Sequence, residues 1–160
     1  MAILCEGNLY PNFTIEEMAN NLSKRDVKIQ FNPEMNKHGM MIQEFRNWFF
    51  CYTSLVKGQG KGLPVNSWFR WPEFNEECGG DPNSCHPDGI ATDFSLPGLT
   101  KNDALLFASV WQAICIKWGV IGGVSIYLRG AKAFMHFDSN NNPNRYASGY
   151  SDKFRINYFK

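Results

Sequence analysis

The sequence lacks the features that mark several large classes of protein. Its formal net charge is only +1, so it has no excess of positive charge that would indicate a nucleic acid or an anionic membrane as partner. No window approaches the roughly 18 apolar residues that a membrane-spanning helix requires. The first residues also lack the basic segment and long apolar run of a secretory signal. We therefore expect a monomer made in the cytoplasm, with neither nucleic acid nor membrane as partner.

Cysteine and histidine are also scarce. The 5 cysteines are an odd number without zinc-finger spacing, so neither a disulfide framework nor a structural cysteine–zinc site is expected. Free, mostly buried thiols are the default. Cys78 and Cys85 flank the loop GGDPNS and could form a disulfide outside the cell, although synthesis in the cytoplasm favours two free thiols. With only 3 histidines in the chain, the position of each one is informative.

The chain has 160 residues, which is enough for one hydrophobic core and too few for two ordinary domains. A single domain spanning residues 1–160 is therefore predicted. A short helix is expected after Thr14, which forms a capping box with Glu17. A long helix is expected from Pro33 to the glycine-rich KGQGKG, and we interpret His38 near its start as a solvated or capping histidine. Its predicted apolar stripe consists of Met41, Phe45, Trp48, Phe49 and Tyr52.

A second long helix is expected between Thr100, as N-cap, and Gly119. Its predicted apolar stripe consists of Leu106, Val110, Ile114 and Trp118. Period-two patterns predict five short strands, in LPVNSW, IATDFS, VSIYL, AFMHFD and RINYF. The segment YLRGAKAF reads as a hairpin turn in which Gly130 supplies a positive backbone dihedral. Together these elements predict an α+β fold with helices packed on a small sheet.

The stretch SCHPDGIATD places His86 in a polar turn, seven residues before Asp93. Alone, this pair fits either a metal site or an ordinary surface turn followed by a helix-capping aspartate. His136 adds a third group, because it shares one face of its predicted strand with Phe134 and Asp138. A catalytic zinc requires three ligands of these types and an open fourth position for water. His86, Asp93 and His136 are therefore predicted to bind Zn²⁺.

The same stretch matches the pattern Ser-x-His-x-x-Gly-x-Ala-x-Asp, and MHFD resembles the motif that carries a third zinc ligand. In these motifs the chain resembles the family of zinc D-Ala-D-Ala carboxypeptidases and phage L-alanyl-D-glutamate endolysins, and above all its carboxypeptidase-like phage branch. The segments NFTIEEM, VNSWFRWPEFNEECGG, GGVSIYL and NRYAS extend the resemblance from about Phe13 to Tyr146. It implies a small antiparallel sheet flanked by helices in a single, hedgehog-like zinc peptidase domain.

The resemblance also implies roles for individual residues. It makes His86, Asp93 and His136 the zinc ligands. It makes Arg70 a cation that contacts a substrate carboxylate or carbonyl oxygen, a task that suits the planar guanidinium. A surface or structural ion pair is the alternative for Arg70. The hydroxyl of Ser84, the serine of the motif, would bond a ligand or brace the loop, unless Ser84 is an ordinary turn residue.

One departure from the family concerns the general base. Members with established hydrolytic mechanisms place Glu, Asp or His two or three residues before the second zinc histidine, where this chain has Phe134 and Ala133. Neither side chain transfers protons. Asp138 is the remaining candidate on the same strand face, and it would either act as the base or orient His136 by accepting its second ring N–H.

The implied function is that of a zinc metallopeptidase that hydrolyses an amide bond in the stem peptide of bacterial peptidoglycan. Arg70 and the metal would stabilise the oxyanion. The missing signal peptide fits a phage lysin or virion component that acts on the cell wall. Which bond is cut stays open among D-Ala-D-Ala, D-Ala to diaminopimelate and L-Ala to D-Glu. The alternative is a non-catalytic zinc domain that binds the wall or belongs to a virion.

Overall fold

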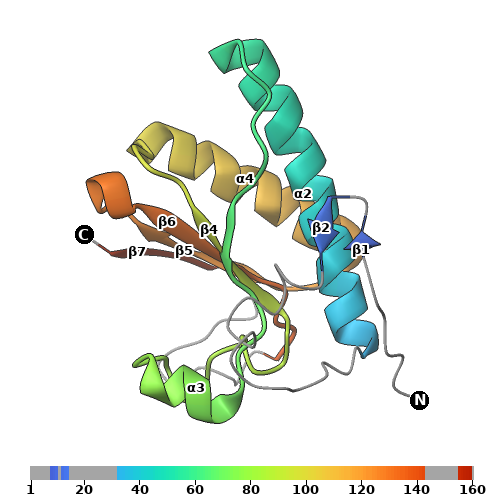
Figure 1. Cartoon of the computed structure of the whole chain (residues 1–160). Coiled ribbons are helices and arrows are strands. Elements are labelled where there is room, and N and C mark those ends of the chain that lie inside the picture. The colour runs from blue at the N-terminus through green and yellow to red at the C-terminus, as the bar shows by residue number, and fades with distance from the viewer. Residues whose placement is uncertain (1–7, 11, 15–31, 143–154, 160) are drawn as a thin grey trace.

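The two long helices lie on one face of a five-stranded sheet, and a short helix lies on the other side (Figure 1). The computed structural model describes residues 8–10, 12–14, 32–142 and 155–159. These residues confirm the expected α+β class. None of their helices has the length and apolar character needed to cross a bilayer. The predicted helix after Thr14 and the motif NRYAS lie outside the described residues.

Helix α2 (Pro33–Lys57) forms where the sequence predicts it. The side chain of Asn32 caps its first turn by accepting a hydrogen bond of 2.8 Å from the backbone N–H of Met35. The helix ends at Gly58, whose φ of 69° is in the left-handed region. The predicted stripe packs into the core, with Met41, Phe45 and Phe49 buried and Trp48 and Tyr52 at the edge.

Helix α4 (Lys101–Trp118) also has the predicted ends, with Thr100 as N-cap and Gly119 as C-cap. Its predicted stripe is partly wrong, because Leu106 is exposed and only Ile114 of the four is fully buried. The helix carries apolar residues around most of its circumference, so more than one stripe fits the spacing. The buried face consists of Ala104, Phe107, Ala108, Trp111, Ile114 and Cys115.

All five predicted strands are present, in the order β3-β4-β6-β5-β7. Their bounds are β3 (Val65–Ser67), β4 (Ala91–Ser95), β5 (Gly123–Tyr127), β6 (Phe134–Asp138) and β7 (Arg155–Phe159). Strands β3, β4, β6 and β5 pair antiparallel with one another, but β7 runs parallel to β5. The sheet is therefore mixed, whereas a wholly antiparallel sheet was expected. Because β4 and β5 already flank β6, the chain after β6 joins the sheet only at an outer edge.

Four smaller elements complete the described structure. Strands β1 (Asn8–Tyr10) and β2 (Phe13–Thr14) form a separate two-stranded sheet. The predicted hairpin between β5 and β6 is confirmed, with a short 3-10 turn, η1 (Gly130–Lys132), at its end. Gly130 there has the expected positive φ, 58°. Helix α3 (Pro72–Glu77) was not predicted.

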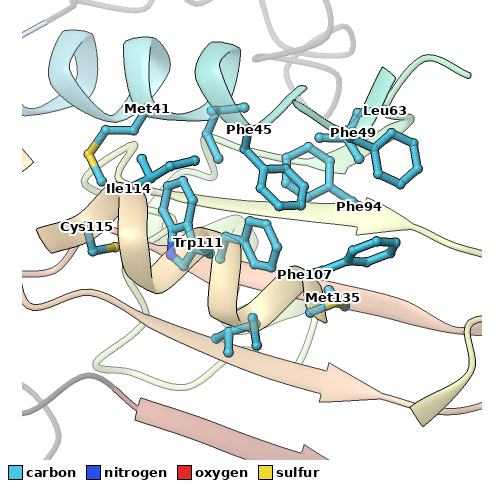
Figure 2. Close-up of a cluster of buried hydrophobic side chains, with 14 of the residues drawn as sticks. Met41, Phe45, Phe49, Leu63, Phe94, Phe107, Trp111, Ile114, Cys115 and Met135 are labelled. Atoms are coloured by element: carbon cyan, nitrogen blue, oxygen red, sulfur yellow. The ribbon is translucent and has the colours of Figure 1, made fainter. Parts of the chain in front are cut away.

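The hydrophobic core fills the space between the sheet and the two long helices (Figure 2). Phe45 of α2 lies at its centre, with its ring centroid 4.7 Å from that of Phe137 and 6.4 Å from that of Trp111. The strands contribute Phe94, Val124, Ile126, Met135 and Phe137. Because side chains alternate along a strand, the opposite face of the sheet carries Asp93 and His136.

Candidate metal centre

Two of the three predicted ligands face each other across neighbouring strands. Asp93 of β4 and His136 of β6 are direct partners in the strand register. His86 comes from the loop that leads into β4. The ligand atoms of the three residues all lie within 4.8 Å of one another. The structure thus brings the predicted group together, and this buried cluster has the composition to hold a metal ion.

A tight turn carries His86 to the site. The backbone N–H of Gly89 donates to the carbonyl of His86 at 2.9 Å, and Gly89 has a φ of 70°. A Cβ at Gly89 would lie 2.4 Å from Cε of Met35, so the turn packs directly against α2. The hydroxyl of Ser84 accepts a hydrogen bond of 3.2 Å from the backbone N–H of His86. Of the roles open to Ser84, this contact favours bracing of the loop.

The ring of His86 is oriented by the backbone. Its Nδ1–H donates to the carbonyl oxygen of Trp68, which leaves Nε2 with a lone pair directed at Asp93 Oδ1, 3.2 Å away. Burial lowers the pKa of His86 and outweighs the opposing charge of Asp93, so the ring is held neutral as a metal ligand must be. Two acceptor atoms that face each other at this distance repel, unless a cation lies between them.

Asp93 connects the histidines to Arg70. Its Oδ2 accepts a hydrogen bond of 2.7 Å from the Arg70 guanidinium, whose Nε donates to Ser67 Oγ at 2.7 Å. Burial alone would raise the pKa of Asp93, but its charge and hydrogen-bond interactions with His86 and His136, which are attractive when the facing ring nitrogen carries a proton, hold it well below its usual range. The carboxylate is therefore ionised. The ion pair considered as the alternative for Arg70 is present, and the Arg70 side chain keeps 17% of its surface exposed beside the site.

His136 uses its two ring nitrogens differently. Nδ1 lies 2.8 Å from Asp93 Oδ1, whereas Nε2 lies 4.0 Å from Asp138 Oδ2. Burial lowers the pKa of His136, but Asp93 and then Asp138 outweigh it and raise the pKa overall. Asp138 is itself buried, and its Oδ1 accepts a hydrogen bond from the backbone N–H of Asn140. Because Asp138 adjoins the nitrogen that is turned away from Asp93, the geometry favours orientation of His136 over direct proton transfer.

Two donor–donor distances of the group are close to those around a zinc ion. Tetrahedral ligands about 2.0–2.2 Å from zinc lie about 3.3–3.6 Å from one another. Asp93 Oδ1 is 3.2 Å from His86 Nε2 and 2.8 Å from His136 Nδ1, so small outward shifts would accommodate the ion. Two imidazoles and one carboxylate are also a donor set that suits zinc. These residues therefore fit the predicted metal.

The interpretation of His38 as solvated or capping is wrong. His38 is fully buried on the core side of α2, and its ring nitrogens bond to Ser139 and Thr92. It lies on the same helical stripe as Ile42 and Phe45, at a spacing of four and seven residues. That spacing was the signal that would have placed it in the core.

The two cysteines near the site are free thiols. Cys78, at the end of α3, is exposed, and Cys85, next to His86, is buried. The disulfide considered between them is not formed in this structure.

Comparisons with known proteins yield no relative. No family model, curated protein or solved structure matches the chain. The family named from the motifs therefore remains a resemblance. The assignment of the metal centre depends on the donor atoms and contacts described above.

Proposed function

We propose that the chain is a zinc-dependent peptidase that hydrolyses an amide bond in the peptide part of bacterial peptidoglycan. The observation that carries this proposal is the convergence of His86 Nε2 and His136 Nδ1 on Asp93 Oδ1. A zinc ion bound there supplies a Lewis acid that polarises a carbonyl group and acidifies water. Support for a stem-peptide substrate, and for action on the wall as a phage lysin or virion component, comes from the sequence motifs.

The chain's own residues have distinct tasks in this proposal. The carbonyl of Trp68 keeps His86 in the tautomer that binds a metal. Arg70 holds Asp93 in place through one N–H group. Its positive charge beside the metal-binding carboxylate would also stabilise negative charge that develops on a carbonyl oxygen. Asp138, whose Oδ2 lies 4.0 Å from Nε2 of His136, would orient that ring electrostatically from the far side.

A non-catalytic zinc domain that binds the wall or belongs to a virion is the second candidate. One observation favours it. Phe134 stacks on Tyr127 at a centroid distance of 4.0 Å, and Ala133 is buried, so neither position supplies a proton-transfer group. The two candidates share the metal centre and differ only in catalysis.

Elemental analysis combined with muropeptide digestion tests both candidates. We expect about one zinc per chain and a mass change that identifies the bond cut. The combined variant His86→Ala and His136→Ala should lose both zinc and cleavage, whereas Asp88→Asn, an exposed carboxylate in the same loop, should keep both. Zinc that survives the double substitution would contradict the metal centre. Bound zinc without cleavage of any muropeptide bond would support the non-catalytic candidate.

A further inference from the structure

A buried polar cluster lies on the helix side of the sheet, behind the metal centre. His38 Nδ1 is 2.8 Å from Ser139 Oγ, and His38 Nε2 is 2.9 Å from Thr92 Oγ1. All three side chains are buried. A neutral imidazole has one donor and one acceptor nitrogen, so one hydroxyl accepts a hydrogen bond from the ring and the other donates one to it. Each ring nitrogen is thus satisfied inside the core.

The two hydroxyl residues adjoin residues of the metal centre in the chain. Thr92 precedes Asp93 on β4, and Ser139 follows Asp138 at the end of β6. Successive strand residues point to opposite faces, so Thr92 faces α2 while Asp93 faces the site. His38 therefore connects α2 to β4 and to the end of β6. Both connections lie next to a carboxylate close to His136, which is Asp93 on β4 and Asp138 on β6.

Two tryptophans connect the same histidine to the site. The rings of Trp68 and Trp111 meet His38 edge-on, at centroid distances of 5.5 and 5.8 Å. The carbonyl of Trp68 accepts the hydrogen bond from His86. The indole N–H of Trp111, which Figure 2 shows within the core, donates to the carbonyl of Asp138 at 3.1 Å. Trp68 and Trp111, which both contact His38, thus also hydrogen-bond to His86 and to Asp138 beside the metal centre.

We propose that His38 is a positioning residue of the metal centre, which it supports from the opposite face of the sheet through Thr92 and Ser139. The inference rests on the proposed metal centre. Burial of an imidazole carries a desolvation cost, and its stripe neighbours Ile42 and Phe45 fill the same core with apolar side chains. Its two directed hydrogen bonds fix Thr92 and Ser139 relative to α2, and each of these residues is next in the chain to a carboxylate beside His136.

The first test measures zinc affinity by competition with a chelator, together with the absorption spectrum of the Co²⁺-loaded protein. His38→Leu should weaken zinc binding by about tenfold and alter the cobalt spectrum. His38→Gln, which keeps a donor and an acceptor, should recover part of the affinity. Phe49→Leu is the matched control, because Phe49 is buried on the same helix against Phe107. It should lower the melting temperature and leave zinc affinity unchanged.

The second test removes the partners of His38. Thr92→Val combined with Ser139→Ala should also weaken zinc binding about tenfold, and His38→Leu should then add little, because the effects share one pathway. If His38→Leu does not fold, the combined variant Thr92→Val and Ser139→Ala tests the inference without it. Wild-type zinc affinity and cobalt spectra in these variants, or an equal loss of affinity in Phe49→Leu, would overturn the inference. A wild-type chain that binds no zinc would instead contradict the metal centre itself.

Discussion

At the scale of single residues, Asp93 is the group on which the others depend. One of its oxygens faces two imidazole nitrogens, and the other accepts a hydrogen bond from Arg70. A buried carboxylate is stable in its charged form only when positive charge or hydrogen-bond donors surround it. A proton on His136 or a metal ion meets that requirement. Protons and metal therefore compete for the same position.

Zinc affinity is expected to fall on acidification. The pKa of His136 is raised above its ordinary value of 6.5, since Asp93 and Asp138 outweigh the effect of burial. Below that raised pKa the metal-free site holds a proton that zinc must displace, so affinity should decline about tenfold per pH unit for each proton displaced. His86, with its lowered pKa, adds to the decline only at lower pH. Chelator competition between about pH 5 and pH 8.5 measures the effect, and a flat profile would contradict it.

Asp138→Asn separates the two roles considered for Asp138. If Asp138 orients His136, as its position at Nε2 favours, zinc affinity should fall by about 10- to 100-fold, and excess zinc should restore activity. If it is the general base, zinc should stay bound while turnover falls by roughly 10²-fold or more, even at saturating zinc. Wall hydrolysis across a zinc titration distinguishes these outcomes. Asp88→Asn is the control, because its carboxylate is exposed.

At the scale of elements, the turn before β4 is coupled to α2. Gly89 has a positive φ and no room for a side chain, because a Cβ would lie 2.4 Å from Cε of Met35. Gly79 has the same φ, 70°, with nothing within 4 Å of its Cβ position. Gly79→Ala should therefore cost only the backbone strain, about 1–2 kcal/mol.

Gly89→Ala should cost about 1–3 kcal/mol more than Gly79→Ala, because the methyl group also displaces Met35 from a packed core. Urea unfolding of both variants measures the difference in the free energy of unfolding. Zinc affinity should fall only for Gly89→Ala, since that turn carries His86. Equal losses of stability in the two variants would show that the contact with α2 contributes nothing.

Element ends were predictable from the sequence where local chemistry sets them. Thr100 and Gly119 bound α4 because an N-cap hydroxyl and a left-handed glycine act on adjacent residues. The buried side of α4 was not predictable from spacing, since Leu106 fits an apolar stripe as well as Phe107 does. The place of β7 beside β5 depends on which sheet edge is free, and a local pattern does not report that.

At the scale of the whole molecule, the two faces of the sheet have different tasks. One face packs against α2 and α4 to form the core, and the other carries the candidate metal centre. The motif around His86 and the strand alternation at His136 predicted the ligand group, because both signals are local. The pairing of Arg70 with Asp93 and of His38 with Thr92 depends on contacts between distant segments. Those contacts became visible only in the folded chain.

Removing the metal should lower the melting temperature and leave the fold intact. The core around Phe45 and Trp111 lies on the side of the sheet opposite the proposed ligands, so we expect folding not to depend on zinc as it does in a zinc finger. A ligand that binds only the folded state adds about 2.7 kcal/mol at a hundredfold excess over its Kd. For a domain of this size that energy corresponds to about 5–11 °C.

Far-UV circular dichroism and thermal unfolding, with and without a chelator, measure this prediction. The melting temperature should rise steadily with free zinc in the wild-type chain. It should be independent of zinc in the combined variant His86→Ala and His136→Ala, which lacks two of the three proposed ligands. Helical signal should persist after chelation, because α2 and α4 are capped and packed without the metal. A chain that loses this signal on chelation would require zinc for folding, which would contradict the division of tasks between the two faces.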